Sequence, residues 1–599
     1  MADSNNLSRA FFVGVGVISA GMLLLILALP TTNPAATPGN TTIAIVGAKV
    51  FDGQRWLADT DILIEAGRIS AMGSALDLPD GARRVDARDL SVLPGLIDAH
   101  VHSYGGALRD SVRFGVTTNF DMFTAPVGLP QTRAARESLD NIEADLFSAG
   151  MLATVDGGHG TQYGVPVATF DTDTDASKWV AQRKAEGSDY IKLVYMPYQN
   201  RLPSLDLTTA TAIIQAAHAA DMLAVAHIST AQAALDLINA DVDGLVHIFA
   251  DQPASDELIQ AARERDVFVI PTLCVLATAD RQDEGAKLAA DPRFTPYLTD
   301  PQNSSLGSDF GLKVPGMTLA GALENVRRLH AGGVRILGGS DAPNPGTTHG
   351  ASLHQELALL VRAGLSESEA LTAATSAAAD AFGVTQRGSL AVGQRADMII
   401  VEGDPAKDIL ATRAIVHVLR NGMEVARAIE TGTAKSMPLG ALSDFSQRAA
   451  APGGFIWSAT DDRDMRGKSD ATLTHIAPTV AQPLGAVRVA GEVRTGFPYP
   501  WAGFSFGAAD GQPRDMGEAA TLSMNLRGTP GIYRVMFFNA GSSGAPPTQE
   551  ITVSDTWQTF NIRIADLNGL NRRSVAGFAI VAGPAPGAFR LDLAEVSLN

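Results

Sequence analysis

The chain of 599 residues contains a single cysteine, Cys274. An intramolecular disulfide is therefore excluded, so no disulfide framework holds this protein together. Cys274 lies in the stretch PTLCVL, and we expect it on a buried strand, as a core residue rather than a nucleophile. No cysteine directly follows the apolar segment at the N-terminus, which excludes a lipoprotein anchor.

Charged residues are also scarce, and basic residues are the scarcer kind. They make up 18% of the chain against 46% apolar residues, which is typical of a globular rather than a disordered protein. The 46 basic and 64 acidic residues leave a formal net charge of −18. This balance argues against a nucleic-acid partner, because phosphate binding needs clustered Lys and Arg. The length suffices for two or three domains.

A dinucleotide-binding motif is missing as well. No G-x-G-x-x-G follows an early strand, which disfavours a doubly wound open sheet. From residue 93 onward, short apolar runs instead alternate with amphipathic stretches such as TAQAALDLINADV. Eight runs within about 250 residues predict an α/β fold, a (β/α)₈ TIM barrel over residues 93–386. The runs are GLIDAHVH, VTTNFDMF, MLATVDGG, YIKLVY, LAVAH, GLVHI, FVIPTL and RILGGSDA.

Residues 10–30 are uncharged and mostly apolar, and they follow Arg9. About twenty such residues can cross a bilayer, and no clear small-x-small cleavage site follows them. We therefore expect a signal anchor in preference to a cleaved signal peptide, followed by a linker over residues 31–41. The expected location is the cell envelope, with the chain anchored in the inner membrane facing the periplasm, or exported.

Alternating apolar and polar residues lie on both sides of the predicted barrel. Residues 42–92 and 387–432 predict the strands of one small, discontinuous β-sandwich. Residues 433–452 predict a linker. Residues 453–599 are rich in Gly, Pro and aromatic side chains and predict a separate all-β domain.

Polar residues lie where the predicted barrel strands end. His100 and His102 stand in LPGLIDAHVH, and residues two apart on a strand project from the same face. Two buried imidazoles side by side need a partner, which is a metal or else a carboxylate or carbonyl group. The other strand-end residues are Lys192 in DYIKLVY, His227 in LAVAH, His247 in DGLVHI and Asp341 in GGSDAP.

Each of these residues has an ordinary alternative when taken singly. A strand-end histidine can be structural, Lys192 can extend to the surface, and Asp341 can cap a turn. Together they gather at the face where TIM-barrel enzymes have their active sites, and imidazole with carboxylate favours zinc. His159 lies between glycines in DGGHG, which predicts a substrate contact, with a simple loop turn as the alternative.

The ordered motifs resemble those of the amidohydrolase superfamily, specifically its imidazolonepropionase-like branch, which includes metallo-dipeptidases. The resemblance covers about residues 42–432. The motifs that carry it are PGLIDAHVH, GGHG, DYIKLVY, AVAH, DGLVHIF, GGSDAP, EALTAATSAAADAFG and RGSLAVGQRADMIIVEGDP.

The resemblance implies two divalent metal ions, with zinc as the expected metal. In this family Lys192 would be carboxylated on its amine and would bridge the two ions, and burial makes such a lysine easier to deprotonate. The ligands of the first ion would be His100, His102 and Asp341, and those of the second would be His227 and His247.

The implied reaction is attack of metal-activated hydroxide on a carbonyl, with Asp341 as general base and then acid. His159 or Tyr195 would bind the developing oxyanion or a substrate carboxylate, although Tyr195 could equally pack in the barrel. The expected substrate is a small molecule with an amide bond, such as a dipeptide or an N-acyl amino acid. One alternative is a single-metal cyclic amidase, lactonase or esterase. Another is an envelope-anchored binding protein whose C-terminal domain does the work.

Residues 453–599 resemble the complex I intermediate-associated protein family, a jelly-roll fold similar to galactose-binding domains. The carriers are DDRDMRGKSDATL, FPYPWAGFSF, YRVMFFNAG, PPTQEITVSDTWQTFNI and GFAIVAGPAPGAFRLDLAEV. The resemblance leaves open a carbohydrate or protein ligand bound through Trp501 or Tyr499, and these aromatics could equally fill the core. A homo-oligomer is also left open.

Overall fold

The computed structural model describes residues 42–599 except for 125, 162–166, 172, 199–201, 312–316, 430–434, 444, 446–449, 452–454, 466–467, 479–484, 496–499, 509–512 and 540–545. The predicted membrane anchor and first linker lie outside the described residues. Within the described part, no helix has both the length and the apolar character needed to cross a bilayer. The described chain divides into two compact units, one holding residues up to 429 and the other those beyond.

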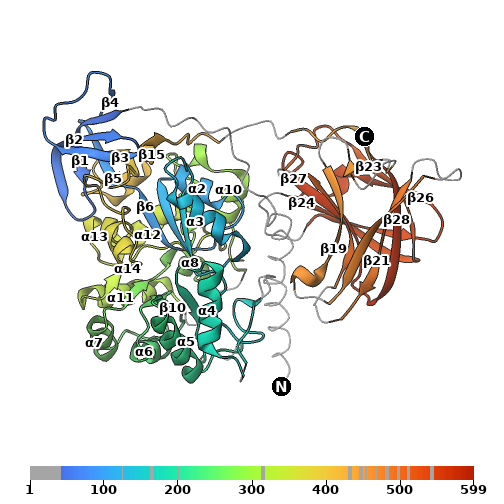
Figure 1. The fold of residues 1–599 in the computed structure, drawn as a ribbon, viewed down its shortest axis with the longest axis horizontal. Helices are drawn as coiled ribbons and strands as arrows, with labels where there is room; N and C mark the ends of the chain where they lie inside the picture. The colour runs from blue at the N-terminus through green and yellow to red at the C-terminus, as the bar shows by residue number, and fades with distance from the viewer. Residues whose placement is uncertain are drawn as a thin grey trace. The chain divides into compact units, whose positions relative to one another are not determined.

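Parallel strands form the centre of the first unit, three of them in one sheet and five in another. Figure 1 shows β6 and β10 among the helices of this unit. Strands β6 to β8 make one parallel sheet, and β9 to β13 make another. Isolated bridges pair Ala153 with Leu193 and Val101 with Ala342, so the two sheets join at both edges in the order of a (β/α)₈ barrel. The strands are β6 (Leu96–Val101), β7 (Val116–Asp121), β8 (Asp145–Ser148), β9 (Ile191–Val194), β10 (Ala224–His227), β11 (Gly244–Val246), β12 (Phe268–Ile270) and β13 (Arg335–Ile336).

Helices pack outside these strands, and Figure 1 shows α4 to α7 side by side along them. Side chains of Asp175, Asp206, Thr230 and Ser255 accept hydrogen bonds from first-turn N–H groups and so begin α4 to α7. The helices are α2 (Ala107–Arg113), α3 (Leu129–Glu137), α4 (Ala176–Glu186), α5 (Leu207–Ala219), α6 (Ala231–Asn239), α7 (Asp256–Glu264), α8 (Leu273–Ala279), α9 (Glu284–Ala289), α10 (Asp300–Leu306), α11 (Leu319–Ala331), α12 (Ala351–Arg362), α13 (Glu367–Ala373) and α14 (Ser376–Ala381).

Alternation along the strands separates two cores. One core draws on six of these strands and on residues next to the other two, and it lies inside them; it includes Tyr190 before β9 and Val225 on β10. The other lies between strands and helices and includes Leu193. Side chains two residues apart on a strand share a face. Lys192, two residues after Tyr190, and His227, two residues after Val225, therefore face the inner core.

Two expectations for this unit are corrected. The third strand is Asp145–Ser148 rather than MLATVDGG, because the apolar run starts earlier and its first part pairs with β7. Cys274 is buried as expected, but it lies on α8 rather than on a strand. Pro271 ends β12, since proline has no N–H to donate to the ladder.

Strands from both ends of the first unit share one eight-stranded sheet, in the order β16-β15-β14-β5-β1-β2-β3 with β4 paired to β1. Strand β5 pairs with both β1 and β14, and so joins two segments far apart in sequence. The strands are β1 (Ile43–Phe51), β2 (Trp56–Glu65), β3 (Arg68–Gly73), β4 (Arg83–Asp86), β5 (Leu90–Pro94), β14 (Met398–Glu402), β15 (Ile415–Arg420) and β16 (Met423–Glu424).

The described residues of the second unit form two antiparallel six-stranded sheets, and one core of apolar side chains draws on both. One sheet is β20-β21-β28-β23-β26 with β17 paired to β28, and the other is β18-β19-β22-β27-β24-β25. Trp501 is half-buried, and Tyr499 lies outside the described residues. The strands are β17 (Gly440–Ser443), β18 (Ala450–Ala451), β19 (Phe455–Asp461), β20 (Asp470–Ile476), β21 (Ala486–Val493), β22 (Ala502–Ala508), β23 (Thr521–Gly528), β24 (Gly531–Asn539), β25 (Thr548–Val553), β26 (Gln558–Arg563), β27 (Val575–Ala582) and β28 (Gly587–Leu598).

Candidate metal centre

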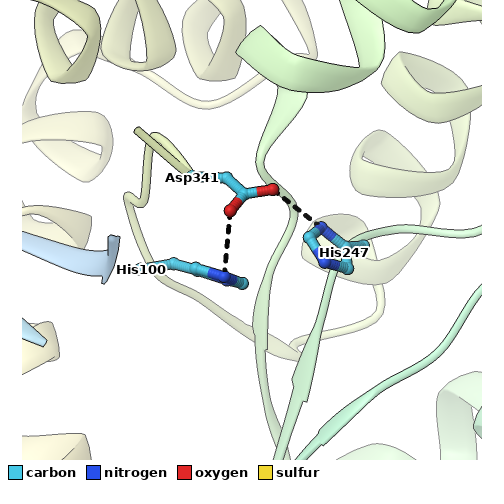
Figure 2. A group of neighbouring side chains, drawn as sticks. All are labelled: His100, His247 and Asp341. Atoms are coloured by element: carbon cyan, nitrogen blue, oxygen red, sulfur yellow. Dashed lines mark ion pairs between the residues drawn. The ribbon is translucent and has the colours of Figure 1, made fainter. Parts of the chain in front are cut away.

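The predicted ligands gather around Asp341, which follows β13 in a loop. Its Oδ1 lies 3.2 Å from Nε2 of His100, on β6, and 3.2 Å from Nε2 of His102, just beyond that strand. Its Oδ2 lies 3.9 Å from Nδ1 of His247, which follows β11. Figure 2 shows His100 and His247 each facing a different oxygen of this carboxylate. Ligand atoms of His100, His247 and Asp341 lie within 4.8 Å of one another, close enough to share one cation.

Two further histidines extend the cluster. His227 ends β10, and its ring centroid lies 4.4 Å from that of His247. The ring of His159, in the loop after β8, lies 4.7 Å from that of His227. The structure therefore brings His159 to the same place as the predicted metal ligands.

Lys192 lies on β9, on the face of the strand that lines the inner core, and its exposed fraction is 3%. Among the described residues, its Nζ has no hydrogen-bond partner. Burial lowers the pKa of Lys192 to about 7, and the nearby charge of Asp341 opposes that shift. A buried amine that loses its proton this readily is open to covalent modification.

The donor set fits a divalent cation. In the described part of the chain, Nδ1 of His100 and Nζ of Lys192 are buried without a hydrogen-bond partner. Such atoms are costly to bury unless they bind something. Burial lowers the pKa of His100 to about 4, so its imidazole is in the neutral form that binds metals. Burial also holds the pKa values of His227 and His247 well below their ordinary range.

Asp98 supports this cluster, and sequence reasoning missed it. Its Oδ1 accepts hydrogen bonds from the backbone N–H groups of Ser340, at 2.9 Å, and His100, at 3.2 Å. Its Oδ2 accepts from the Ser340 hydroxyl at 2.6 Å. One buried carboxylate therefore ties β6 to the residue before Asp341. The available signal was an acidic residue inside the apolar run GLIDAHV.

His349, in the loop after β13, is a second neighbour of the cluster. Its Nε2 lies 3.1 Å from the carbonyl oxygen of His102, so it contacts the backbone that carries a predicted ligand.

Tyr195 makes its polar contact away from the cluster, which disfavours the predicted role of this residue in binding the oxyanion or a substrate carboxylate. Its hydroxyl lies 3.0 Å from Oδ2 of Asp236, on α6, and donates a hydrogen bond to it. Its ring packs with Leu193 in the core between strands and helices. Because side chains alternate along a strand, Lys192 and Tyr195 face opposite sides. The structure therefore agrees with the alternative prediction, in which Tyr195 packs in the barrel.

Comparison with known proteins finds relatives that resemble this chain in sequence or in fold. An imidazolonepropionase of Salinispora tropica is 27% identical over 398 residues, which cover 62% of this chain and 93% of that protein. A dihydroorotase of Halobacterium salinarum is 25% identical over 385 residues, covering 58% and 85%. A crystal structure of an Xaa-Pro dipeptidase with bound methionine aligns with a TM-score of 0.51 and 22% identity, covering 64% of this chain and 99% of that one. That last likeness shows a shared fold.

A model of the amidohydrolase family matches residues 91–433, more than half of the chain. The match ends at residue 433 and does not include residues 453–599, so their resemblance to a jelly-roll family stays a prediction. The matched range includes all eight barrel strands and every residue of the cluster around Asp341. The chain therefore belongs to the amidohydrolase family and is a hydrolase that acts on carbon–nitrogen bonds.

Proposed function

We propose that the protein hydrolyses an amide bond in a small molecule, with dipeptides or N-acyl amino acids as the substrate class. The site would hold two zinc ions bridged by carboxylated Lys192. The observation that carries this proposal is the buried Nζ of Lys192, which has no hydrogen-bond partner among the described residues. Cations would repel an ammonium at this position, whereas a carbamate would offer them two negatively charged oxygens.

The ligand roles in this proposal are those that the resemblance to the family implies. His100, His102 and Asp341 would hold one ion, and His227 and His247 would hold the other. Bound ions would polarise the amide carbonyl and lower the pKa of water at the site.

Two side chains would handle protons and charge. Asp341 would take a proton from the attacking water and deliver it to the leaving amine. Neighbouring histidines hold its pKa well below the ordinary range in spite of burial, so it is ionised and able to accept that proton. Burial lowers the pKa of His159 to about 4, so its neutral imidazole can donate an N–H to the oxygen that gains charge.

Metal content per chain tests the proposal. We expect elemental analysis of the wild-type protein to find two zinc ions. Lys192→Ala should hold one or none, because it removes the bridge, and its activity should fall by about 100-fold or more. Lys178→Ala is the matched control, since this lysine on α4 is exposed, with its side chain 87% accessible. It should keep both ions.

Two other outcomes would change the conclusion. A single ion that survives Lys192→Ala would favour the alternative, a one-metal enzyme that opens cyclic amides, lactones or other esters. Absence of any ion in the wild-type protein would contradict the metal-dependent reaction itself.

The substrate class needs its own experiment, because the relatives include enzymes acting on amide and on cyclic amide bonds. Steady-state hydrolysis of dipeptides and N-acyl amino acids should be compared with that of cyclic amides and lactones. The proposal requires a higher kcat/KM for the linear amides.

We also propose that residues 10–30 hold the enzyme in the cell envelope. Fractionation of cells that express the full chain should find it with the membranes. A chain that starts after residue 30 should be released into the soluble fraction.

A further inference from the structure

The preceding strand does not explain how His247 is aimed. Val246, the last residue of β11, belongs to the inner core, and Leu245 packs toward the helices. Strict alternation would turn His247 toward the helices as well. His247 instead has a φ of +68°, in the left-handed region, and its ring lies beside that of His227. A contact from outside the strand must hold the ring in this orientation.

Thr272 makes that contact. Its Oγ1 lies 2.7 Å from Nδ1 of His247, and its side chain is fully buried. The backbone N–H of His247 donates to the carbonyl of Ile270 at 2.9 Å, so the end of β12 holds both the ring and the backbone of His247. Metal-binding histidines commonly donate their second ring N–H to an oxygen, which fixes the ring orientation and the tautomer.

Because its hydroxyl contacts His247, Thr272 does not cap the adjacent helix in the usual way. Thr272 is the N-cap of α8, where a threonine ordinarily accepts a hydrogen bond from a first-turn N–H. Among the described residues, its side chain makes no such bond. Its φ of +51° is also unfavourable for a β-branched residue. The first N–H groups of α8 therefore need another acceptor.

Glu356 is that acceptor. Its Oε1 accepts from the N–H of Leu273 at 2.8 Å, and its Oε2 accepts from the N–H of Cys274 at 2.8 Å. The side chain comes from α12 and is fully buried. Burial raises the pKa of Glu356 to about 8, and the two backbone donors oppose that shift. Both oxygens keep acceptor lone pairs in either protonation state.

We propose that Glu356 and Thr272 form a positioning relay for His247. Glu356 holds the first turn of α8, that turn holds Thr272 in its left-handed conformation, and the Thr272 hydroxyl accepts the Nδ1 proton of His247. Nε2 is then the ring nitrogen presented to a cation. Thr272 and Glu356 act through His247 and are positioning residues. The inference rests on the proposed function in one respect, namely that His247 is a metal ligand.

Zinc affinity of the full chain, measured by competition with a chromophoric chelator, tests the relay. Thr272→Val keeps the shape of threonine without the hydroxyl and should weaken binding about 10- to 100-fold, while Thr272→Ser should restore it to within about threefold of wild type. Glu356→Gln places an amide N–H against a backbone N–H. It should weaken binding about tenfold although it touches no ligand.

A matched control lies on the same helix. The hydroxyl of Thr278 donates to the carbonyl of Cys274 at 3.4 Å, away from His247, so Thr278→Val should bind zinc as the wild type does. Nitrogen NMR of the metal-free protein adds a readout that needs no activity. The wild-type protein should carry the His247 proton on Nδ1, and Thr272→Val should lose that preference. Melting temperatures identify any variant that does not fold.

The outcomes separate the relay from the metal proposal. Wild-type zinc affinity in folded Thr272→Val, or a His247 proton on Nε2 in the wild type, overturns the relay. If Glu356→Gln does not fold, the two Thr272 variants and the tautomer decide. A wild-type protein that binds no zinc contradicts the proposed function, while the tautomer of the metal-free protein still supports or overturns the relay.

Discussion

Gly339 stands two residues before Asp341, and its position is fixed by a close approach. A Cβ added there would lie 2.4 Å from Cγ2 of Ile270 and 2.9 Å from the backbone nitrogen of His100. Both distances are shorter than real Cβ contacts, so a neighbour would have to move. The second glycine of GGSDAP is therefore required by space beside a candidate ligand.

Gly339→Ala should disturb the metal centre without touching a ligand side chain. We expect destabilisation of about 1–3 kcal/mol from overpacking, and zinc affinity about tenfold weaker because His100 is displaced. Chelator competition and chemical denaturation measure the two effects. Gly81→Ala is the control, since no described atom lies within 4 Å of a Cβ at that position. Unchanged affinity in Gly339→Ala would mean that His100 is not held by this contact.

At the scale of elements, α12 carries buried polar groups into the layer between strands and helices. Beside Glu356, it holds His354, which is 1% exposed. Nε2 of His354 lies 2.8 Å from the carbonyl oxygen of Phe114, and its Nδ1 lies 3.0 Å from the Thr412 hydroxyl. Burial lowers the pKa of His354 to about 3, so the folded protein keeps this ring neutral.

The His354 pKa predicts a loss of stability in acid. Below about pH 6.5, the unfolded chain binds a proton at this histidine that the folded chain does not, so stability falls as the pH falls toward 3. The histidine should account for about 2 kcal/mol of the loss between pH 7 and pH 5. Unfolding free energies at both pH values should show that His354→Gln is less sensitive to pH than the wild type.

A matched variant separates titration from packing. Thr412→Val removes a hydrogen bond to the ring and keeps the titrating group, so it should lower stability equally at both pH values. If His354→Gln kept the full pH sensitivity of the wild type, the account of His354 would be wrong.

At the scale of the whole first unit, a buried ion network joins the eight-stranded sheet to the barrel. Asp145, the first residue of β8, is fully buried. It pairs with Arg387 at 2.7 Å, with Arg395 at 3.2 Å and with Arg420 at the end of β15. The arginine charges compensate for burial of the carboxylate, which by itself raises the pKa of Asp145.

Asp145→Asn should destabilise the first unit by about 3–5 kcal/mol, because Arg387 and Arg395 lose the carboxylate with which they pair, whereas Arg420 keeps its pair with Asp397. Chemical denaturation measures this loss. Asp86→Asn, which removes an exposed partner of Arg88, should leave stability within experimental error. A small effect of Asp145→Asn would show that solvent reaches the network.

The sequence by itself determined the repeating strand and helix pattern and several of the polar residues near the strand ends. Both are local, because strand alternation and helical spacing depend on residues two to four positions apart. His100, His102, Lys192 and His227 could be placed in this way.

The tertiary structure alone decided the rest. It turned His247 against the alternation of its strand, directed Tyr195 to Asp236, and selected the earlier half of one apolar run as β8. It also supplied Asp98 and Glu356, whose hydrogen-bond partners include residues far away along the chain. These features depend on non-local contacts, which a chain shows only after its strands and helices have packed.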